Sequence, residues 1–218
     1  SKSIIMHFIH RGIVNKKYKE NLISSFKKSF SLGYGIETDI HLTKDREFVC
    51  FHDFTLNRIF KKKASIKNLN YPYIKELSIN QNKEVPLLKD VLKISKNKYP
   101  LLIELKPKLS KKNLQKLIKE VSKYSKCIYI SFNHQNIFNL QKIKPNIKVG
   151  LSFSSLSSIK KIIKASKNEK ISCLILDKVF LTHKKIMNLK IRKFFYTIKT
   201  KSDFKRYREK NNLIFENL

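Results

Sequence analysis

The sequence predicts a single α/β domain folded as a distorted TIM-type barrel, (β/α)8 in plan. A chain of 218 residues with 41% apolar side chains is long enough to bury one core. Short apolar runs alternate along it with amphipathic segments, and eight such runs read as strands. These runs are rich in β-branched and aromatic residues and span residues 4–9, 35–40, 48–52, 101–105, 127–132, 148–153, 172–176 and 194–198.

The segments between these runs have apolar residues at helical spacing, as at Leu114, Leu117, Ile118 and Val121. Helices are predicted over residues 20–32, 85–96, 110–125, 134–142, 155–167, 182–189 and 202–210. We see no internal repeat or linker, so residues 1–218 are expected to form one barrel domain. The segment at about 54–84, rich in Lys, Asn and Ser, is expected to be an excursion over the barrel mouth.

One connection departs from the strand–helix–strand rhythm. Only seven residues join the second and third predicted strands, too few for a parallel crossover, so these strands should pair antiparallel. A turn centred on residues 44 and 45 would place Glu37 opposite His52 and Asp39 opposite Cys50. Because alternate residues of a strand share a face, we expect Glu37 and Asp39 to lie together beside His52.

The charge of the chain is unusual, with 48 Lys+Arg against 16 Asp+Glu and a net charge of +32. Such a balance is typical of proteins that bind nucleic acid, anionic membranes or acidic substrates. Here all but six of the basic residues are Lys, spread along the whole chain, and Lys, Asn and Ile all have A/T-rich codons. We therefore favour a compositional origin and expect no specific nucleic-acid partner. Peripheral contact with an anionic membrane stays open.

The cysteines and the apolar runs bear on the compartment. No stretch approaches the ~18 uncharged residues of a membrane-spanning helix, and the first apolar run is too short for a signal peptide. The three cysteines lie in apolar runs without CxxC spacing, which disfavours a thiolate metal site: Cys50, Cys127 and Cys173. Buried free thiols fit a reducing environment, so we expect a soluble, cytoplasmic protein.

Polar groups at the ends of barrel strands are the catalytic candidates. They are His10, Arg11, Glu37, Asp39, His52, Asp53, Glu104 and Lys106. Glu37, Asp39 and Glu104 occupy strand interiors, where charge is normally excluded. Ion pairing with Arg11 or Lys106 is one explanation. The other is a hard divalent cation, Mg²⁺ or Ca²⁺, because carboxylates without a cysteine ligand select such an ion.

The two histidines and the two cations complete a chemical pattern. Imidazole titrates near neutral pH, so His10 and His52 suit an acid–base pair. Arg11 and Lys106 suit the oxygens of a phosphate group. Together with a cation, this set describes phosphodiester cleavage.

Short motifs follow one another in a fixed order along the chain. They are HRG at 10–12, GIETDIHLTKD at 35–45, CFHDFTLNR at 50–58, VPLLKDVL at 85–92 and IELKP at 103–107. In this order and spacing they resemble the glycerophosphodiester phosphodiesterase family of the PLC-like phosphodiesterase superfamily. The resemblance covers nearly the whole chain.

The resemblance implies a distorted TIM barrel that hydrolyses glycerophosphodiesters, such as glycerophosphocholine or glycerophosphoethanolamine, to sn-glycerol 3-phosphate and an alcohol. It implies three sets of site residues: Glu37, Asp39 and Glu104 as ligands of Mg²⁺ or Ca²⁺, His10 and His52 as acid and base, and Arg11 and Lys106 as phosphate contacts. Phe132 and Tyr196 are candidates for the substrate wall. The sequence leaves open the preferred cation, the role of each histidine, the leaving alcohol and the oligomeric state. It also leaves open whether the nucleophile is water or the glycerol hydroxyl of the substrate.

Two departures from the family pattern concern the substrate wall. Tyr196 stands where family members commonly have Trp, and residues 215–218 replace a Thr-Asp-x-Pro-like segment. Two alternative functions follow from the charge and from these departures. One is a lysophospholipase D that acts at anionic membranes, and the other is a non-catalytic, basic nucleic-acid-binding protein.

Overall fold

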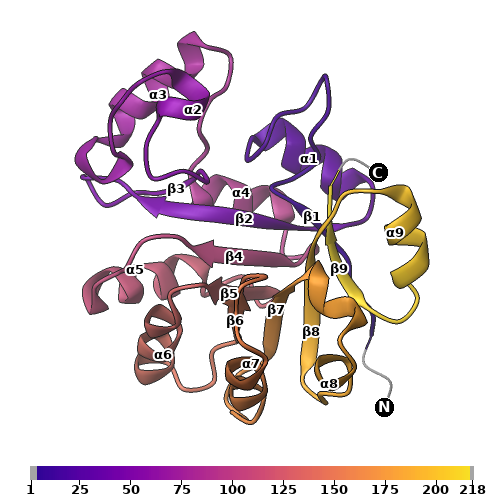
Figure 1. The fold of residues 1–218 in the computed structure, drawn as a ribbon. Helices are drawn as coiled ribbons and strands as arrows, with labels where there is room; N and C mark the ends of the chain where they lie inside the picture. The colour runs from indigo at the N-terminus through magenta and orange to yellow at the C-terminus, as the bar shows by residue number, and fades with distance from the viewer. Residues whose placement is uncertain (1–3, 217–218) are drawn as a thin grey trace.

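The computed structural model of the chain describes residues 4–216 and confirms the TIM barrel (Figure 1). Eight parallel strands form a closed ring because β1 pairs with both β2 and β9. In ring order they are β1 (Phe8–His10), β2 (Gly35–Leu42), β4 (Leu101–Leu105), β5 (Cys127–Ser131), β6 (Val149–Phe153), β7 (Cys173–Asp177), β8 (Arg192–Ile198) and β9 (Asn212–Phe215).

The membership of this ring differs from the prediction in two strands. The predicted strand at 48–52 is β3 (Phe48–Cys50), which pairs antiparallel with β2 outside the ring. The eighth ring strand is instead β9, which was not predicted. Its four residues are few, and only the neighbouring strands β8 and β1, distant in sequence, give it pairing partners.

The antiparallel pairing of β2 and β3 is confirmed, but the predicted register is wrong by one residue. Cys50 lies opposite Ile40 and not opposite Asp39. By the same shift, Glu37 is not opposite His52. A shift of one residue exchanges the faces that the paired side chains present, so this difference matters for the site.

The turn between β2 and β3 explains the register. The Thr43 amide donates a hydrogen bond to the Glu47 carbonyl (3.0 Å), which closes a five-residue turn centred on Asp45. Arg46 takes up the extra residue in the left-handed region, at φ 63°. Non-glycine residues rarely adopt this conformation. The turn was therefore predicted to centre between residues 44 and 45, whereas the observed turn centres on Asp45.

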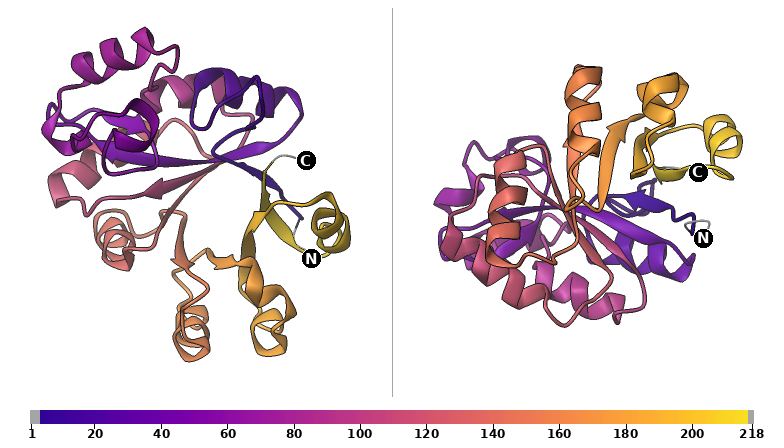
Figure 2. Two further views of the ribbon diagram at one scale, coloured as in Figure 1. Left: turned by 45° about the horizontal axis from the view of Figure 1, so that its top comes forward. Right: turned by 90° about the horizontal axis from the view of Figure 1, so that it is seen from below.

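Helices cover the outside of the ring (Figure 2). They are α1 (Ile23–Ser31), α4 (Leu88–Ser95), α5 (Lys111–Val121), α6 (His134–Ile143), α7 (Ile159–Ser166), α8 (Lys184–Met187) and α9 (Lys201–Tyr207), and each lies within or against a predicted segment. Side-chain caps set some of their starts, since Ser110 and Ser158 accept hydrogen bonds from the third residue that follows. None of the helices within residues 4–216 combines the length and apolar character needed to span a membrane.

The interior of the ring is filled below the mouth. Seven buried apolar side chains from six different strands form this plug: Phe8, Leu102, Ile130, Cys173, Ile175, Phe194 and Ile214. A second and larger core lies between the strands and the helices. Because the plug closes the barrel from within, polar side chains can gather only at the end to which the parallel strands point.

The segment at 54–84 contains three short helices, α2 (Asn57–Phe60), the 3-10 helix η1 (Ile66–Asn68) and α3 (Tyr71–Asn80). It stands beside β3 in Figure 1. It has a small apolar core of its own, in which Leu56, Phe60, Ile66 and Ile74 pack against residues around β3. Its membership in the same folding domain stays a prediction.

Candidate active site

The open end of the barrel holds a cavity of about 400 Å³. The nine residues to which the sequence assigns a role all line it: His10, Arg11, Glu37, Asp39, His52, Glu104, Lys106, Phe132 and Tyr196. Asp53, a further candidate at the end of a predicted strand, does not line it. None of the lining residues comes from the described segment 54–84. Among these nine residues, His10 and Tyr196 are the most distant in sequence, 186 positions apart, and the strand ends bring them into one cavity.

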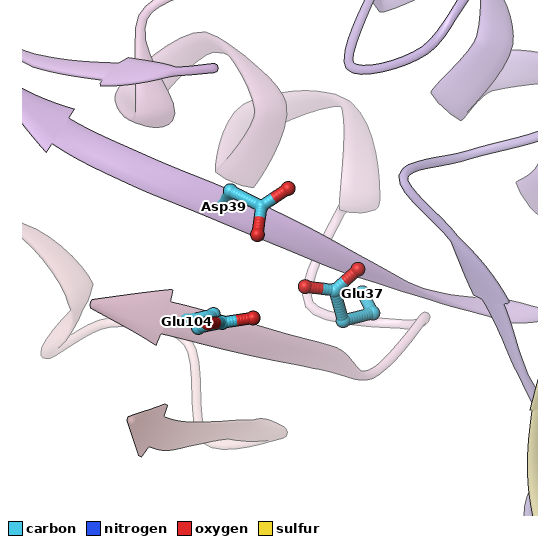
Figure 3. A group of neighbouring side chains, drawn as sticks. All are labelled: Glu37, Asp39 and Glu104. Carbon is cyan, nitrogen blue, oxygen red and sulfur yellow. The ribbon is translucent and has the colours of Figure 1, made fainter. Parts of the chain in front are cut away.

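Three carboxylates on two neighbouring strands lie close to one another (Figure 3). All three line the cavity. Glu37 and Asp39 share a face of β2, two residues apart, and Glu104 lies on β4 directly beside Asp39 in the strand register. One oxygen from each of the three lies within 4.8 Å of the others. All three are buried, with relative exposures of 3%, 1% and 8%.

Burial and mutual repulsion set the protonation of these carboxyl groups. Burial, followed by the charges of Asp39 and Glu104, raises the pKa of Glu37 well above its usual range. Burial and the charge of Asp39 raise the pKa of Glu104 to about 7. Burial also opposes ionisation of Asp39, but the guanidinium of Arg11 and other cations outweigh it and lower that pKa. The trio therefore needs additional positive charge to be fully ionised at neutral pH.

The cations already present satisfy only part of this need. Arg11 Nε lies 3.4 Å from Asp39 Oδ2, and Lys106 Nζ lies 3.3 Å from Glu104 Oε1, so the ion pairs considered as an alternative do form. Glu37 Oε1 is nevertheless buried without a hydrogen-bond partner. An unpaired buried carboxylate oxygen beside two more carboxylates suits a hard divalent cation. The residues present thus fit the predicted Mg²⁺ or Ca²⁺.

A tight turn after β1 directs Arg11 toward the carboxylates. Arg11 and Gly12 both have left-handed backbone conformations, with φ of 55° and 71°. A Cβ atom on Gly12 would lie 2.9 Å from the ring of Phe26, so only glycine fits there. The turn leaves Arg11 Nε buried and without a hydrogen bond, although it lies near Asp39.

His10 is held by a residue that the sequence did not reveal. Its Nδ1 lies 2.9 Å from Glu216 Oε2, just beyond the end of β9. A carboxylate can only accept, so Nδ1 carries the hydrogen and Nε2 faces the carboxylate cluster, 3.7 Å from Glu37 Oε2. The hydrogen bond from His10 lowers the pKa of Glu216 despite burial, and Lys199 lies 3.7 Å from its other oxygen.

His52 is held in a similar way from the opposite side of the carboxylates. Its Nδ1 donates to Asp53 Oδ1 at 2.8 Å, which leaves Nε2 for a substrate. Burial is the main cause that lowers the pKa of His52 below its ordinary value, so the neutral ring is favoured. Asp53 remains ionised because its hydrogen bonds with Arg58 lower its pKa to about 2.

Arg58 connects the 54–84 segment to both sides of the site. Its guanidinium binds Asp53 through Nε (2.9 Å) and one terminal nitrogen (3.0 Å). It also binds both oxygens of Glu20, at 2.6 and 3.0 Å. Glu20 in turn accepts from Arg11 at 3.2 Å. The chain Arg11–Glu20–Arg58–Asp53–His52, called the clamp below, thus links a predicted phosphate contact with a predicted acid or base.

The clamp was not predicted, although Glu20 and Arg58 are among the residues that resemble the family. Glu20 and Arg58 lie near the HRG and HD motifs, but spacing alone does not show that their side chains meet. Asn21 is also among the residues that resemble the family, but no role was predicted for it. It donates to Asp39 Oδ2 at 3.2 Å and accepts from Thr38 at 2.9 Å, and thereby fixes the Asp39 carboxylate.

The opposite wall of the cavity is mostly apolar. Phe132 and Tyr196 meet edge to face with ring centroids 6.0 Å apart, and the Tyr196 hydroxyl donates to the Phe153 carbonyl at 2.8 Å. Ser152 also lines this wall, and its hydroxyl is buried without a hydrogen-bond partner. The wall can therefore accept an apolar or uncharged group beside one unused hydroxyl.

A sequence model of the glycerophosphoryl diester phosphodiesterase family matches residues 10–211, which include all nine predicted site residues. The chain belongs to this family. The resemblance proposed from the HRG, ExD, HD and ELKP motifs is thus confirmed.

Individual relatives agree with this membership in the glycerophosphodiester phosphodiesterases. The glycerophosphodiester phosphodiesterase of Caldanaerobacter subterraneus is 33% identical over 159 residues, 66% of this chain and 65% of the relative. The human lysophospholipase D GDPD1 is 31% identical over 134 residues, 55% of this chain and 40% of the relative. The chain spans just under two thirds of the length of three bacterial curated relatives that it matches.

Solved structures of glycerophosphodiester phosphodiesterases share the fold. The enzyme of Thermotoga maritima superposes with a TM-score of 0.83 at 20% identity, over 99% of this chain and 96% of its own. A phosphodiesterase of Oleispira antarctica, solved with its product sn-glycerol-3-phosphate, gives a TM-score of 0.82 at 20% identity, over 97% and 92% of the two chains.

Proposed function

We propose that this chain hydrolyses glycerophosphodiesters to sn-glycerol 3-phosphate and an alcohol with a divalent cation as cofactor. The observation that carries the proposal is the trio Glu37, Asp39 and Glu104, with one unpaired oxygen, between two oriented histidines in one cavity. Family membership and the product found in the Oleispira antarctica structure support the same substrate class.

The proposed substrate contacts come from both sides of the carboxylates. Arg11 has a buried Nε without a hydrogen bond, and a phosphate oxygen would satisfy it. Lys106 lies at the cavity edge beside Glu104 and would contact a second oxygen. A cation held by Glu37, Asp39 and Glu104 would offset the charge of the phosphoryl oxygens as it builds up in the transition state.

The two histidines move the protons in this proposal. Each has Nδ1 bound to a carboxylate, Glu216 for His10 and Asp53 for His52, and each keeps Nε2 for the reaction. One neutral histidine removes the proton of the attacking hydroxyl, from water or from the glycerol of the substrate. The other, protonated, donates to the leaving alkoxide, so the two histidines together gain and lose one proton per bond cleaved.

The test is release of sn-glycerol 3-phosphate from glycerophosphocholine and glycerophosphoethanolamine by protein stripped with a chelator and then supplied with Mg²⁺ or Ca²⁺. We expect activity only after a cation is added, and none in a His10→Ala/His52→Ala double variant, which serves as the contamination blank. Turnover that persists in chelator would contradict the cation assignment. Salt-sensitive DNA binding without any hydrolysis would instead favour the basic-protein alternative.

A second candidate substrate is a lysophospholipid. The similarity to human lysophospholipase D GDPD1 and the apolar wall formed by Phe132 and Tyr196 favour it. Assaying lysophosphatidylcholine beside glycerophosphocholine distinguishes the two, because both release choline but only the first carries an acyl chain. Faster turnover of the lysophospholipid would make it the preferred substrate.

A further inference from the structure

Three consecutive loops at the open end of the barrel each expose one large apolar side chain. Phe132 follows β5 and is 45% exposed, Leu156 follows β6 and is 94% exposed, and Val179 follows β7 and is 54% exposed. These strands are parallel neighbours in the ring, so their loops lie side by side on one flank of the cavity. We call these three residues the apolar rim.

The apolar rim differs from the other exposed apolar residues of the described chain. Phe54, Tyr73 and Ile79 belong to the 54–84 segment. Ile4 and Ile5 precede β1 and Leu32 follows α1, all three at the opposite end of the barrel. Single exposed apolar side chains are common on soluble proteins, whereas a group of them beside a cavity marks a surface that binds something. Leu156 in particular is too exposed to contribute to packing.

Exposed lysines flank the apolar rim. Lys108 lies in the loop after β4, Lys178 precedes Val179, and Lys201 lies at the start of α9 after β8. Asp177 lies on the same edge, and its carboxylate accepts a hydrogen bond from the Val179 backbone amide at 2.9 Å. Apolar side chains beside cations are the combination that binds the headgroup region of an anionic bilayer.

We infer that the apolar rim and its lysines are a docking surface for an anionic lipid bilayer. The net charge of +32 is spread over the molecule, so charge alone does not determine which face would meet the bilayer. The apolar rim determines that face. Docking by this face would turn the cavity toward the lipid surface and bring the site to diesters held there. Docking to a bilayer is a property separate from hydrolysis, so this inference goes beyond the proposed function. Vesicle binding can be measured without any turnover.

The binding test uses vesicles of phosphatidylcholine alone and vesicles of phosphatidylcholine with phosphatidylglycerol, sedimented with the protein in the presence of chelator. We expect binding to the anionic vesicles, weakened but not abolished by salt, and little binding to the neutral ones. No binding to either kind of vesicle would overturn the inference. The same would be true of equal binding to both.

Paired variants then locate the binding face. A Leu156→Ser/Val179→Ser variant should lower the partition coefficient about tenfold. Leu32→Ser, at the opposite end of the barrel, should leave it unchanged. Lys178→Glu/Lys201→Glu should weaken binding more than Lys144→Glu/Lys170→Glu, whose lysines precede β6 and β7 at the opposite end.

The lysine pairs change the net charge equally, so they separate a docking face from general attraction. Equal weakening in both pairs would overturn the inference. Hydrolysis of water-soluble glycerophosphocholine by the Leu156→Ser/Val179→Ser variant checks that its fold is intact. Unchanged vesicle binding in that variant would also overturn the docking surface. A wild-type protein that binds vesicles but hydrolyses no diester would contradict only the proposed function.

Discussion

The two halves of the barrel mouth differ in what they place in the cavity. The half formed by β9, β1, β2 and β4 supplies the charged and titrating groups, with Glu216, His10, Glu37, Asp39 and Glu104 on or next to these strands. The half formed by β5 to β8 supplies the apolar side chains Ile130, Phe132, Ile175 and Tyr196, together with the polar residues Ser152, Thr197 and Lys199. Because adjacent strands carry like groups, the cavity has a charged side and an apolar side.

The functional groups of the charged side are held by ion pairs and hydrogen bonds with other side chains, whereas on the apolar side the Tyr196 hydroxyl binds a backbone carbonyl, that of Phe153. On the charged side, ion pairs and hydrogen bonds fix nearly every functional atom, as with His10 by Glu216 and Asp39 by Asn21. On the apolar side, Phe132 is half exposed and its contact with Tyr196 is an edge-to-face packing. We therefore expect changes on the charged side to reduce catalysis and changes on the apolar side to alter substrate choice.

The largest effect is expected from the histidines. His10→Ala and His52→Ala should each lower kcat by about 10³–10⁴-fold, because each removes a proton donor or acceptor in the transition state. Rates of glycerol 3-phosphate release measure this, with His183→Ala, at the N-cap of the outer helix α8, as the matched control. If either variant kept the wild-type rate, the substituted histidine could not be the proposed acid or base.

Glu37→Gln should follow, with a loss of about 10²–10³-fold in kcat/KM because the cation loses a charged ligand. The same substitution removes a buried like charge, so thermal unfolding in chelator should occur at a higher temperature than in the wild type. Cation titration by calorimetry should show weaker binding. Full activity together with unchanged cation affinity would contradict the assigned site.

Arg58→Gln should lower kcat about 10–100-fold with a smaller change in KM for glycerophosphocholine, because Arg58 orients His52 and Arg11 through Asp53 and Glu20 and does not itself line the cavity. Adding Asp53→Asn to it should cost little more, since both changes break the same chain. Arg206→Gln on the exposed face of α9 is the control. Additive losses would show that Arg58 and Asp53 act separately.

Substitutions on the apolar side should change selectivity more than rate. Phe132→Leu and Tyr196→Phe are expected to shift the ratio of kcat/KM for glycerophosphocholine over glycerophosphoethanolamine by roughly tenfold or less. The apolar-side groups face the cavity without a fixed hydrogen bond to the carboxylates. A loss of kcat/KM as large as that expected for Glu37→Gln would show that the two halves do not differ in their roles.

The smallest effect concerns acid stability. Hydrogen bonds with Arg58 lower the folded-state pKa of Asp53 from 3.8 to about 2, so the pair stabilises the fold at pH above 3.8. This contribution is lost as pH falls through the window from 3.8 to about 2. The wild type should therefore melt roughly 2–4 °C above Arg58→Gln at pH 6, with the gap closing near pH 2. A gap that does not depend on pH would assign the effect to packing.

Local pattern predicted most of the fold and the charged groups of the site. Strand periodicity placed Glu37 with Asp39 and Glu104 with Lys106, and the short connection predicted the antiparallel β3. The register failed because Arg46 adopts a left-handed conformation that its residue type disfavours. Such a conformation is decided by the surrounding contacts and not by the turn sequence alone.

Contacts across long sequence distances escaped prediction. Glu216 lies 206 positions from His10, and only closure of the ring between β9 and β1 brings them together. Arg58 meets Glu20 across 38 positions, through a segment whose helices were not expected. Strand or helix periodicity could not have predicted either pair, because the two residues of each pair lie on different elements.

Pairing of β9 with β1 has a consequence for the order of events during synthesis. When the ribosome has released residues up to β8, all three carboxylates and both histidines have been made, but His10 still lacks the carboxylate that orients it. The strand that closes the ring also delivers Glu216. A nascent chain is therefore expected to gain catalytic competence in the same step in which the barrel becomes closed.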